Sequence, residues 1–151
     1  MITYHNLIPG KYSIEQEEKI TRWIQQVIEN EGFKPGEVVY IFGSDKYING
    51  INKRYLNHDT FTDIITFQES VNQEIISGEI YISLDRIVEN AKLFNVTVDN
   101  ELSRVLVHGV LHLMGYNDKT ESEKRVMRSK ENYYINLQPN NFGKLFHVKH
   151  S

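Results

Sequence analysis

The sequence predicts an α+β domain in which a small mixed β-sheet packs against about five helices. Short β-rich runs are concentrated before residue 85, and amphipathic runs of helical spacing dominate the remainder. The 151 residues suffice for one domain with a proper core. We expect this domain to cover residues 1–138. Residues 139–151 show no periodicity, which predicts a flexible or loosely docked tail.

The N-terminal segment predicts a strand over residues 1–6 and then a helix. Ser13 to Gln16 fits a capping box, in which the serine hydroxyl accepts from a helix amide and the glutamine reaches back. The helix that would follow ends at Gly32. Its apolar residues recur at helical spacing: Ile20, Trp23, Ile24, Val27 and Ile28.

The middle of the chain predicts three strands and two helices. Residues 37–42 (EVVYIF) read as a largely buried strand, and Ser44 begins a helix that extends to about Leu56. Residues 63–67 (DIITF) and 78–84 (GEIYISL) are β-rich and predict two strands of one sheet. A helix follows over residues 85–94, and its expected inward residues are Ile87, Val88, Ala91 and Phe94.

Two further helices complete the domain. One is capped within residues 97–100 and runs to about Met114, with core anchors at Leu102, Val105, Leu106, Leu113 and Met114. The last helix begins at a second capping box, Thr120 to Glu123. Its apolar residues are Val126, Met127, Tyr133 and Tyr134.

Composition limits the possible functions. The chain has no cysteine, so a metal ion would have to be held by histidines and carboxylates. A net charge of −3 argues against a protein that coats nucleic acid through its overall field, although a local basic patch remains compatible. The sequence has neither a signal-peptide pattern nor an apolar run long enough to span a membrane, so we expect a cytoplasmic protein with no membrane partner.

The residues that point most strongly to chemistry are His108, His112 and Asp118. The two histidines are four residues apart, so on a helix their imidazoles lie on one face. Gly115 permits the left-handed backbone that ends a helix and lets the chain return Asp118 to the same point. Three such ligands and an open position are typical of catalytic zinc, and we expect one zinc ion per chain near the C-terminal third. The alternative is a pair of core-facing imidazoles bonded to the backbone.

The residue after the first histidine bears on the reaction. In zinc peptidases of the H-E-x-x-H type this position holds the glutamate that acts as general base, and here it is Gly109. A glycine cannot accept a proton, and it would leave room for a bulky substrate backbone. A zinc-activated water that attacks a phosphodiester therefore fits the residues better than peptide hydrolysis does.

Four segments resemble a known family. Residues 108–118 resemble the signature H-G-x-L-H-L-x-G-Y-D-H of the YbeY family, the bacterial metal-dependent endoribonucleases of rRNA maturation. Residues 62–67 resemble the family's T-D-V-L-S-F segment and residues 78–83 its G-D-I-x-I-S strand. Glu101-Leu102 corresponds to the family's E-L before the metal helix, and the matches keep the family's order.

The resemblance implies a zinc-dependent, single-strand-specific endoribonuclease that acts in ribosome maturation, including at the 3′ end of small-subunit rRNA. Its partners would be single-stranded RNA or rRNA and ribosomal particles. One alternative is a ribosome-assembly binding factor whose metal is structural. Another is a metallopeptidase, against which Gly109 counts.

The chain departs from the family pattern at two places. The motif ends in Asn117-Asp118 instead of Asp-His, so the third zinc ligand would be a carboxylate. Family members commonly carry a phosphate-holding arginine in a Y-R-G-K-D segment, where this chain has Leu56. Arg54 is a candidate replacement, although an exposed helix-surface residue is the alternative, and His58 falls where the family has its lysine. No catalytic residue is assigned beyond the metal ligands.

Basic residues cluster just after the motif. They are Lys119, Lys124, Arg125, Arg128 and Lys130, with acidic residues interspersed. Such a cluster is either a solvated helix face or a surface that neutralises an RNA backbone beside the metal.

Overall fold

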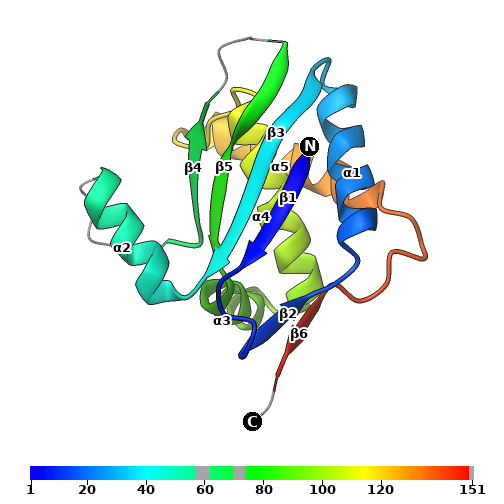
Figure 1. Ribbon diagram of the computed structural model, residues 1–151. Coiled ribbons are helices and arrows are strands. Elements are labelled where there is room, and N and C mark those ends of the chain that lie inside the picture. Colours follow the sequence, from blue (N-terminus) through cyan, green and yellow to red (C-terminus); the bar gives the residue numbers. More distant parts are fainter. Residues whose placement is uncertain (57–61, 70–73, 150–151) are drawn as a thin grey trace.

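A mixed four-stranded sheet organises the computed structural model, which describes residues 1–56, 62–69 and 74–149 (Figure 1). In spatial order its strands are β1 (Ile2–Asn6), β3 (Lys34–Gly43), β5 (Ile75–Ser83) and β4 (Ile64–Gln68). β1, β3 and β5 run parallel, and β4 is antiparallel to β5. The prediction of an α+β domain with a mixed sheet is confirmed.

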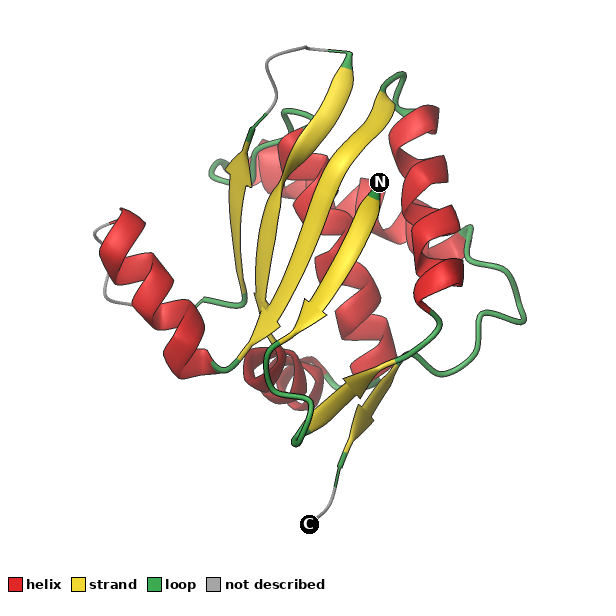
Figure 2. Ribbon diagram, viewed as in Figure 1, coloured by secondary structure: helices red, strands yellow, loops and turns green. Residues whose placement is uncertain are grey.

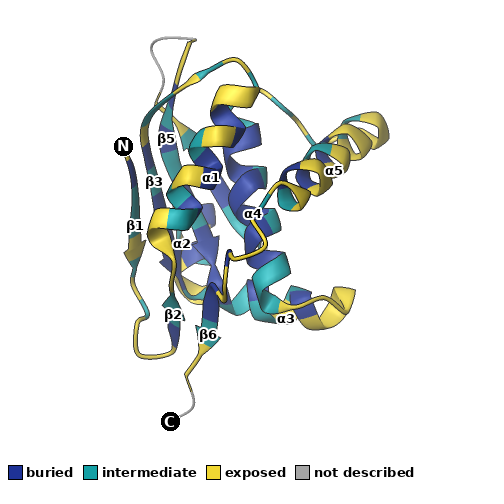
Figure 3. Ribbon diagram, turned by 90° about the vertical axis from the view of Figure 1, so that its right-hand side faces the viewer, coloured by how far each residue is buried: buried dark blue, intermediate teal, exposed yellow. Residues whose placement is uncertain are grey.

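The described residues form five helices, as expected. They are α1 (Glu17–Asn30), α2 (Asp45–Leu56), α3 (Leu84–Phe94), α4 (Val98–Leu113) and α5 (Glu121–Asn136). Figure 2 shows the sheet lying in front of most of the helices. From the side, α1 and α4 cover one face of the sheet and α5 packs on the far side of α4 (Figure 3). α4 is therefore the central helix of a layered structure.

Strand β3 shows how the sheet meets the helices. Val38, Tyr40 and Phe42 alternate along the strand and are at most 1% exposed, so their side chains point into the core. The buried Tyr40 hydroxyl donates a hydrogen bond to the backbone oxygen of Leu106 on α4, at 2.8 Å. This bond satisfies a polar group that would otherwise be costly to bury.

Helix α4 is buried along most of its length because both its sequence and its neighbours favour close packing. Thr97 caps it by accepting a hydrogen bond from the Asn100 amide, within the predicted region. Two glycines allow the helix to approach the sheet. A Cβ on Gly109 would lie 2.8 Å from Ile80, and one on Gly78 would lie 2.9 Å from Leu113.

The predicted caps and faces of α3 and α5 are confirmed in part. Thr120 and Glu123 form the expected capping box. Met127 and Tyr134 are buried, whereas Val126 and Tyr133 are exposed, because α5 contacts the rest of the protein along a narrow stripe. On α3, Phe94 is exposed instead of facing inward, since it lies in the last turn, beyond the part of the helix that reaches the core.

The expected capping box at Ser13 is wrong, and part of the expected tail is docked. Ser13 lies in a strand, β2 (Tyr12–Ile14), that pairs antiparallel with β6 (Phe146–Val148). α1 begins after Gln16, whose φ is 62°, and no side chain caps the N-terminus of this helix. The tail residues Phe142, Leu145 and Phe146 are buried, so residues 142–148 are docked. The paired residues of β2 and β6 lie about 130 residues apart in the sequence, so local sequence patterns do not predict the pairing.

Within residues 1–56, 62–69 and 74–149, no helix combines the length and hydropathy that crossing a membrane requires.

Candidate metal centre

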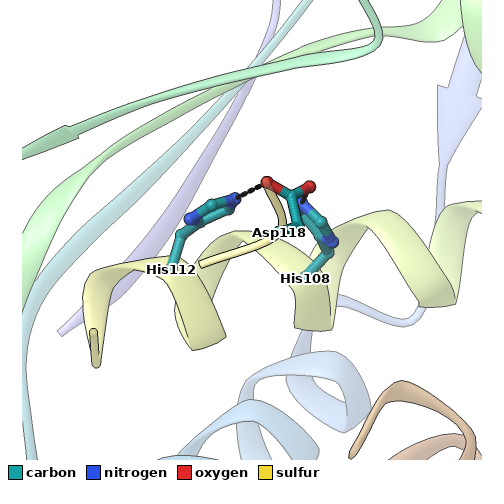
Figure 4. A group of neighbouring side chains, drawn as sticks. All are labelled: His108, His112 and Asp118. Atoms are coloured by element: carbon teal, nitrogen blue, oxygen red, sulfur yellow. Dashed lines mark ion pairs between the residues drawn. The ribbon is translucent and has the colours of Figure 1, made fainter. Parts of the chain in front are cut away.

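The three predicted ligand residues converge on one point. His108 and His112 project from the same face of α4, and Asp118 reaches them from the segment that follows the helix (Figure 4). His108 Nε2 lies 3.4 Å from Asp118 Oδ2, and His112 Nε2 lies 3.5 Å from Asp118 Oδ1. The centroids of the two imidazole rings are 4.7 Å apart.

This arrangement fits a metal ion. One ligand atom from each residue can be chosen so that all three lie within 4.8 Å of one another. A tetrahedral zinc ion with bonds of about 2.0–2.1 Å holds its ligand atoms about 3.3 Å apart. Both Nε2 atoms meet that spacing to the Asp118 carboxylate. Two imidazoles and a carboxylate are also a donor set that zinc accepts, so the residues fit the ion that the sequence predicts.

The turn that delivers Asp118 is held from both sides. Gly115 has a φ of 102°, and the Tyr116 amide donates to the backbone oxygen of Leu111, which closes the helix end as predicted. The Tyr116 hydroxyl then donates to the Glu31 carboxylate at the end of α1, at 2.5 Å. Lys130 and Tyr134 of α5 donate to the same carboxylate. The segment before Asp118 is thus tied to two other helices.

His108 is oriented by a carboxylate on α5. Its Nδ1 lies 2.7 Å from Glu131 Oε2, and a carboxylate can only accept, so Nδ1 carries the hydrogen and Nε2 faces Asp118. Arg104 donates to the other oxygen of Glu131 at 2.9 Å. Burial would raise the pKa of Glu131, but the bonds from His108 and Arg104 outweigh it and lower the pKa. Glu131 therefore stays charged.

Replacing Glu131 by glutamine should weaken metal binding by roughly 10- to 100-fold, the usual cost of losing the partner of a metal-binding histidine. Glutamine has the same shape, so the loss would reflect the missing charge behind the imidazole. Zinc titration of folded protein measures the effect. Glu121→Gln on the exposed first turn of α5 is the matched control, and an affinity for Glu131→Gln equal to that of the control would contradict this role for Glu131.

A cavity of about 440 Å³ opens beside the three ligand residues, and Glu101 and Asp63 are among the acids that line it. Burial raises the pKa of Glu101 to about 7, with a further contribution from the charge of Asp63. Burial also raises the pKa of Asp63, and the neighbouring His108 offsets part of that rise. An acid with a pKa near 7 can both accept and donate a proton at neutral pH.

Gly109 does not face this cavity. It is buried, and a Cβ on it would point at Ile80 and at Ile64, 3.2 Å away, between α4 and the sheet. The expectation that Gly109 leaves room for a substrate is wrong, because the room is taken by the sheet. Position 109 still carries no side chain that could act as a general base.

Of the two candidate phosphate contacts, the structure describes Arg54. Arg54 is exposed on α2, with its guanidinium 6.0 Å from the ring centroid of Tyr55, and it is not among the described residues that line the cavity. Leu56 ends the same helix. His58 lies outside the described residues.

Sequence reasoning missed Glu131, Arg104 and the acidic pair that lines the cavity. Glu131 is 23 residues after His108 and on another helix, and no spacing links the two. Asp63 and Glu101 lay inside the segments that resembled the YbeY family, which was the available signal.

Comparison with known proteins agrees with that resemblance. The model of the family described as "Endoribonuclease YbeY" matches residues 9–138. The endoribonuclease YbeY of Flavobacterium johnsoniae is 48% identical over 125 residues, which cover 83% of this chain and 89% of that protein. The one of Flavobacterium psychrophilum is 46% identical over 138 residues, covering 91% and 92%.

A solved structure has the same fold. The solution structure of TM1509 from Thermotoga maritima superposes with a TM-score of 0.64 and 27% sequence identity. The match covers 89% of this chain and 87% of that one.

Proposed function

The chain belongs to the endoribonuclease YbeY family, and from this membership we propose that it is a zinc-dependent endoribonuclease that cuts single-stranded RNA during rRNA maturation. The proposed place of action is the 3′ end of small-subunit rRNA on ribosomal particles in the cytoplasm. The observation that carries the zinc proposal is the convergence of His108, His112 and Asp118 beside a cavity.

The residues of the site have distinct proposed roles. His108, His112 and Asp118 would hold one zinc ion per chain, which supplies a Lewis acid and lowers the pKa of bound water toward about 7. Glu131 fixes the ring of His108, which leaves Nε2 facing Asp118 and able to hold the ion. Glu101, which lines the cavity beside the ligand residues, would exchange a proton with groups bound there.

Two other functions compete with this proposal. A binding factor with a structural metal is favoured by one observation, the absence of the family's arginine at Leu56. A metallopeptidase is disfavoured because Gly109, at the position of the peptidase general base, has no side chain that could accept a proton. A zinc ion held by three protein ligands favours catalysis over a purely structural role.

Zinc-loaded protein is expected to cleave a defined single-stranded RNA, to spare the same RNA in a duplex, and to leave unfolded casein intact. A chelator should abolish the cleavage, since the reaction depends on the ion. Gel analysis of the three substrates at matched enzyme concentration makes the measurement. Chelator-sensitive casein cleavage with intact RNA would support the peptidase, and RNA binding without any cleavage would support the binding factor.

A further inference from the structure

A second cavity, of about 220 Å³, adjoins the metal centre on the side of α5. It is lined by His108, Asp118, Lys124, Met127, Arg128 and Glu131. Four of these residues also line the larger cavity, among them Arg128 and the two ligand residues. The two cavities therefore meet at the metal centre, and we call the smaller one the α5 groove.

Among the described residues, two cations of the α5 groove have only distant ion-pair partners. Lys124 Nζ lies 3.9 Å from Glu121, Arg128 Nη1 lies 3.9 Å from Glu131, and both side chains are more than half exposed. Glu131 is already occupied by Arg104 at 2.9 Å and by His108 at 2.7 Å. Lys124 and Arg128 can therefore turn toward an anion without breaking a strong ion pair.

Two other cations near the metal centre are engaged in ion pairs. Arg104 bonds both Glu131 and Asn132 and is mostly buried, and Lys130 bonds Glu31. Lys124, Arg128 and Glu131 are spaced by four and three residues, which places them on one face of α5. Arg125, one residue beyond Lys124, is not among the described residues that line either cavity.

An RNA strand needs cations beside the phosphate that is cut. Leu56 stands where the family has its phosphate-holding arginine, so this chain must neutralise phosphates with another residue. Of the two arginines that line the larger cavity within the described residues, Arg128 is the one without a close ion pair. A guanidinium can bind a phosphate through two parallel hydrogen bonds, and an ammonium acts as a point charge.

We propose that the α5 groove is a phosphate subsite, in which Arg128 and Lys124 bind the RNA phosphate that neighbours the scissile one. The inference rests on the proposed function. It assigns to Arg128 the phosphate contact that Leu56 cannot make. It also gives the basic residues after the motif different roles: Lys124 and Arg128 contact RNA, whereas Arg125 is a solvated surface residue.

The test compares Lys124→Gln/Arg128→Gln with Arg125→Gln. Binding of a labelled single-stranded DNA of the substrate's sequence, which carries the same phosphates, is followed by anisotropy over a salt series. Each phosphate contact on a single strand contributes about −0.7 to the slope of log affinity against log salt. The double variant should lose about 1.4 from this slope, whereas Arg125→Gln should keep the wild-type slope.

Kinetics and metal content complete the test. Arg128→Gln alone should raise KM for single-stranded RNA about 10-fold, the effect of one charged hydrogen bond, with zinc content unchanged. An unchanged salt slope in the double variant, or an equal loss in Arg125→Gln, would overturn the subsite. Failure of the wild-type protein to cleave RNA would instead overturn the proposed function, so the two failures are distinguishable.

Discussion

Replacing His112 by alanine is expected to lower zinc affinity by more than roughly 100-fold and to abolish RNA cleavage. Removing the residue that hydrogen-bonds a metal ligand lowers metal affinity by about 10- to 100-fold. Removing the ligand itself should lower the affinity by more than that. Only His108 and Asp118 would remain, 3.4 Å apart, and two ligands retain little of the chelation. Elemental analysis of purified protein and cleavage of a single-stranded RNA measure the two effects.

His5→Ala is the matched control, because His5 is exposed on β1 and outside the metal centre. It should keep both zinc and activity. Full zinc occupancy in the His112→Ala protein would show that the ion is held elsewhere. The same experiment with Asp118→Asn tests the third ligand, since a neutral amide binds zinc poorly.

Gly109→Leu should destabilise the protein by about 3 kcal/mol, the upper end of the usual cost of an overfilled core. Even a Cβ at this position would lie 2.8 Å from Ile80, which is completely buried and cannot move aside. The larger side chain must push α4 away from the sheet. For a chain of this size the cost corresponds to a fall in Tm of about 6–12 °C, measured by thermal unfolding.

Gly50→Leu makes the same change where space is available. Gly50 is exposed in the middle of α2, and nothing lies within 4 Å of a Cβ there. Leucine also favours helix over glycine, so Tm should stay level or rise. If Tm fell as much in Gly50→Leu as in Gly109→Leu, tight packing at Gly109 would not be the cause of the lower Tm.

The local features of the fold and the site were predictable from the sequence. The capping box at Thr120, the cap at Thr97 and the left-handed Gly115 depend on residues within one turn of each other. The convergence of His108, His112 and Asp118 follows from helical spacing and a helix end, and the described structure brings these residues together. Each of these features depends on residues that are close in the sequence, so local patterns predict it.

Features that depend on distant partners were not predictable. Ser13 fits a capping box by sequence, but pairing of its strand with residues 146–148 prevails over the local preference. The sequence suggests that Gly109 opens toward a substrate, because nothing in it indicates that Ile80 lies against this residue. Glu131 reaches His108 only because α5 folds back along α4.

The tie between Tyr116 and Glu31 has a consequence for the order in which the protein is made. A nascent chain that has just passed residue 118 contains every proposed ligand, and α1 with Glu31 has long been synthesised. Lys130 and Tyr134, which hold Glu31, and Glu131, which holds His108, have not yet been added. Because domains are translated from the N-terminus, the ligand residues are fixed in place only when α5 emerges from the ribosome. Assembly of the metal centre thus has to wait for the synthesis of α5.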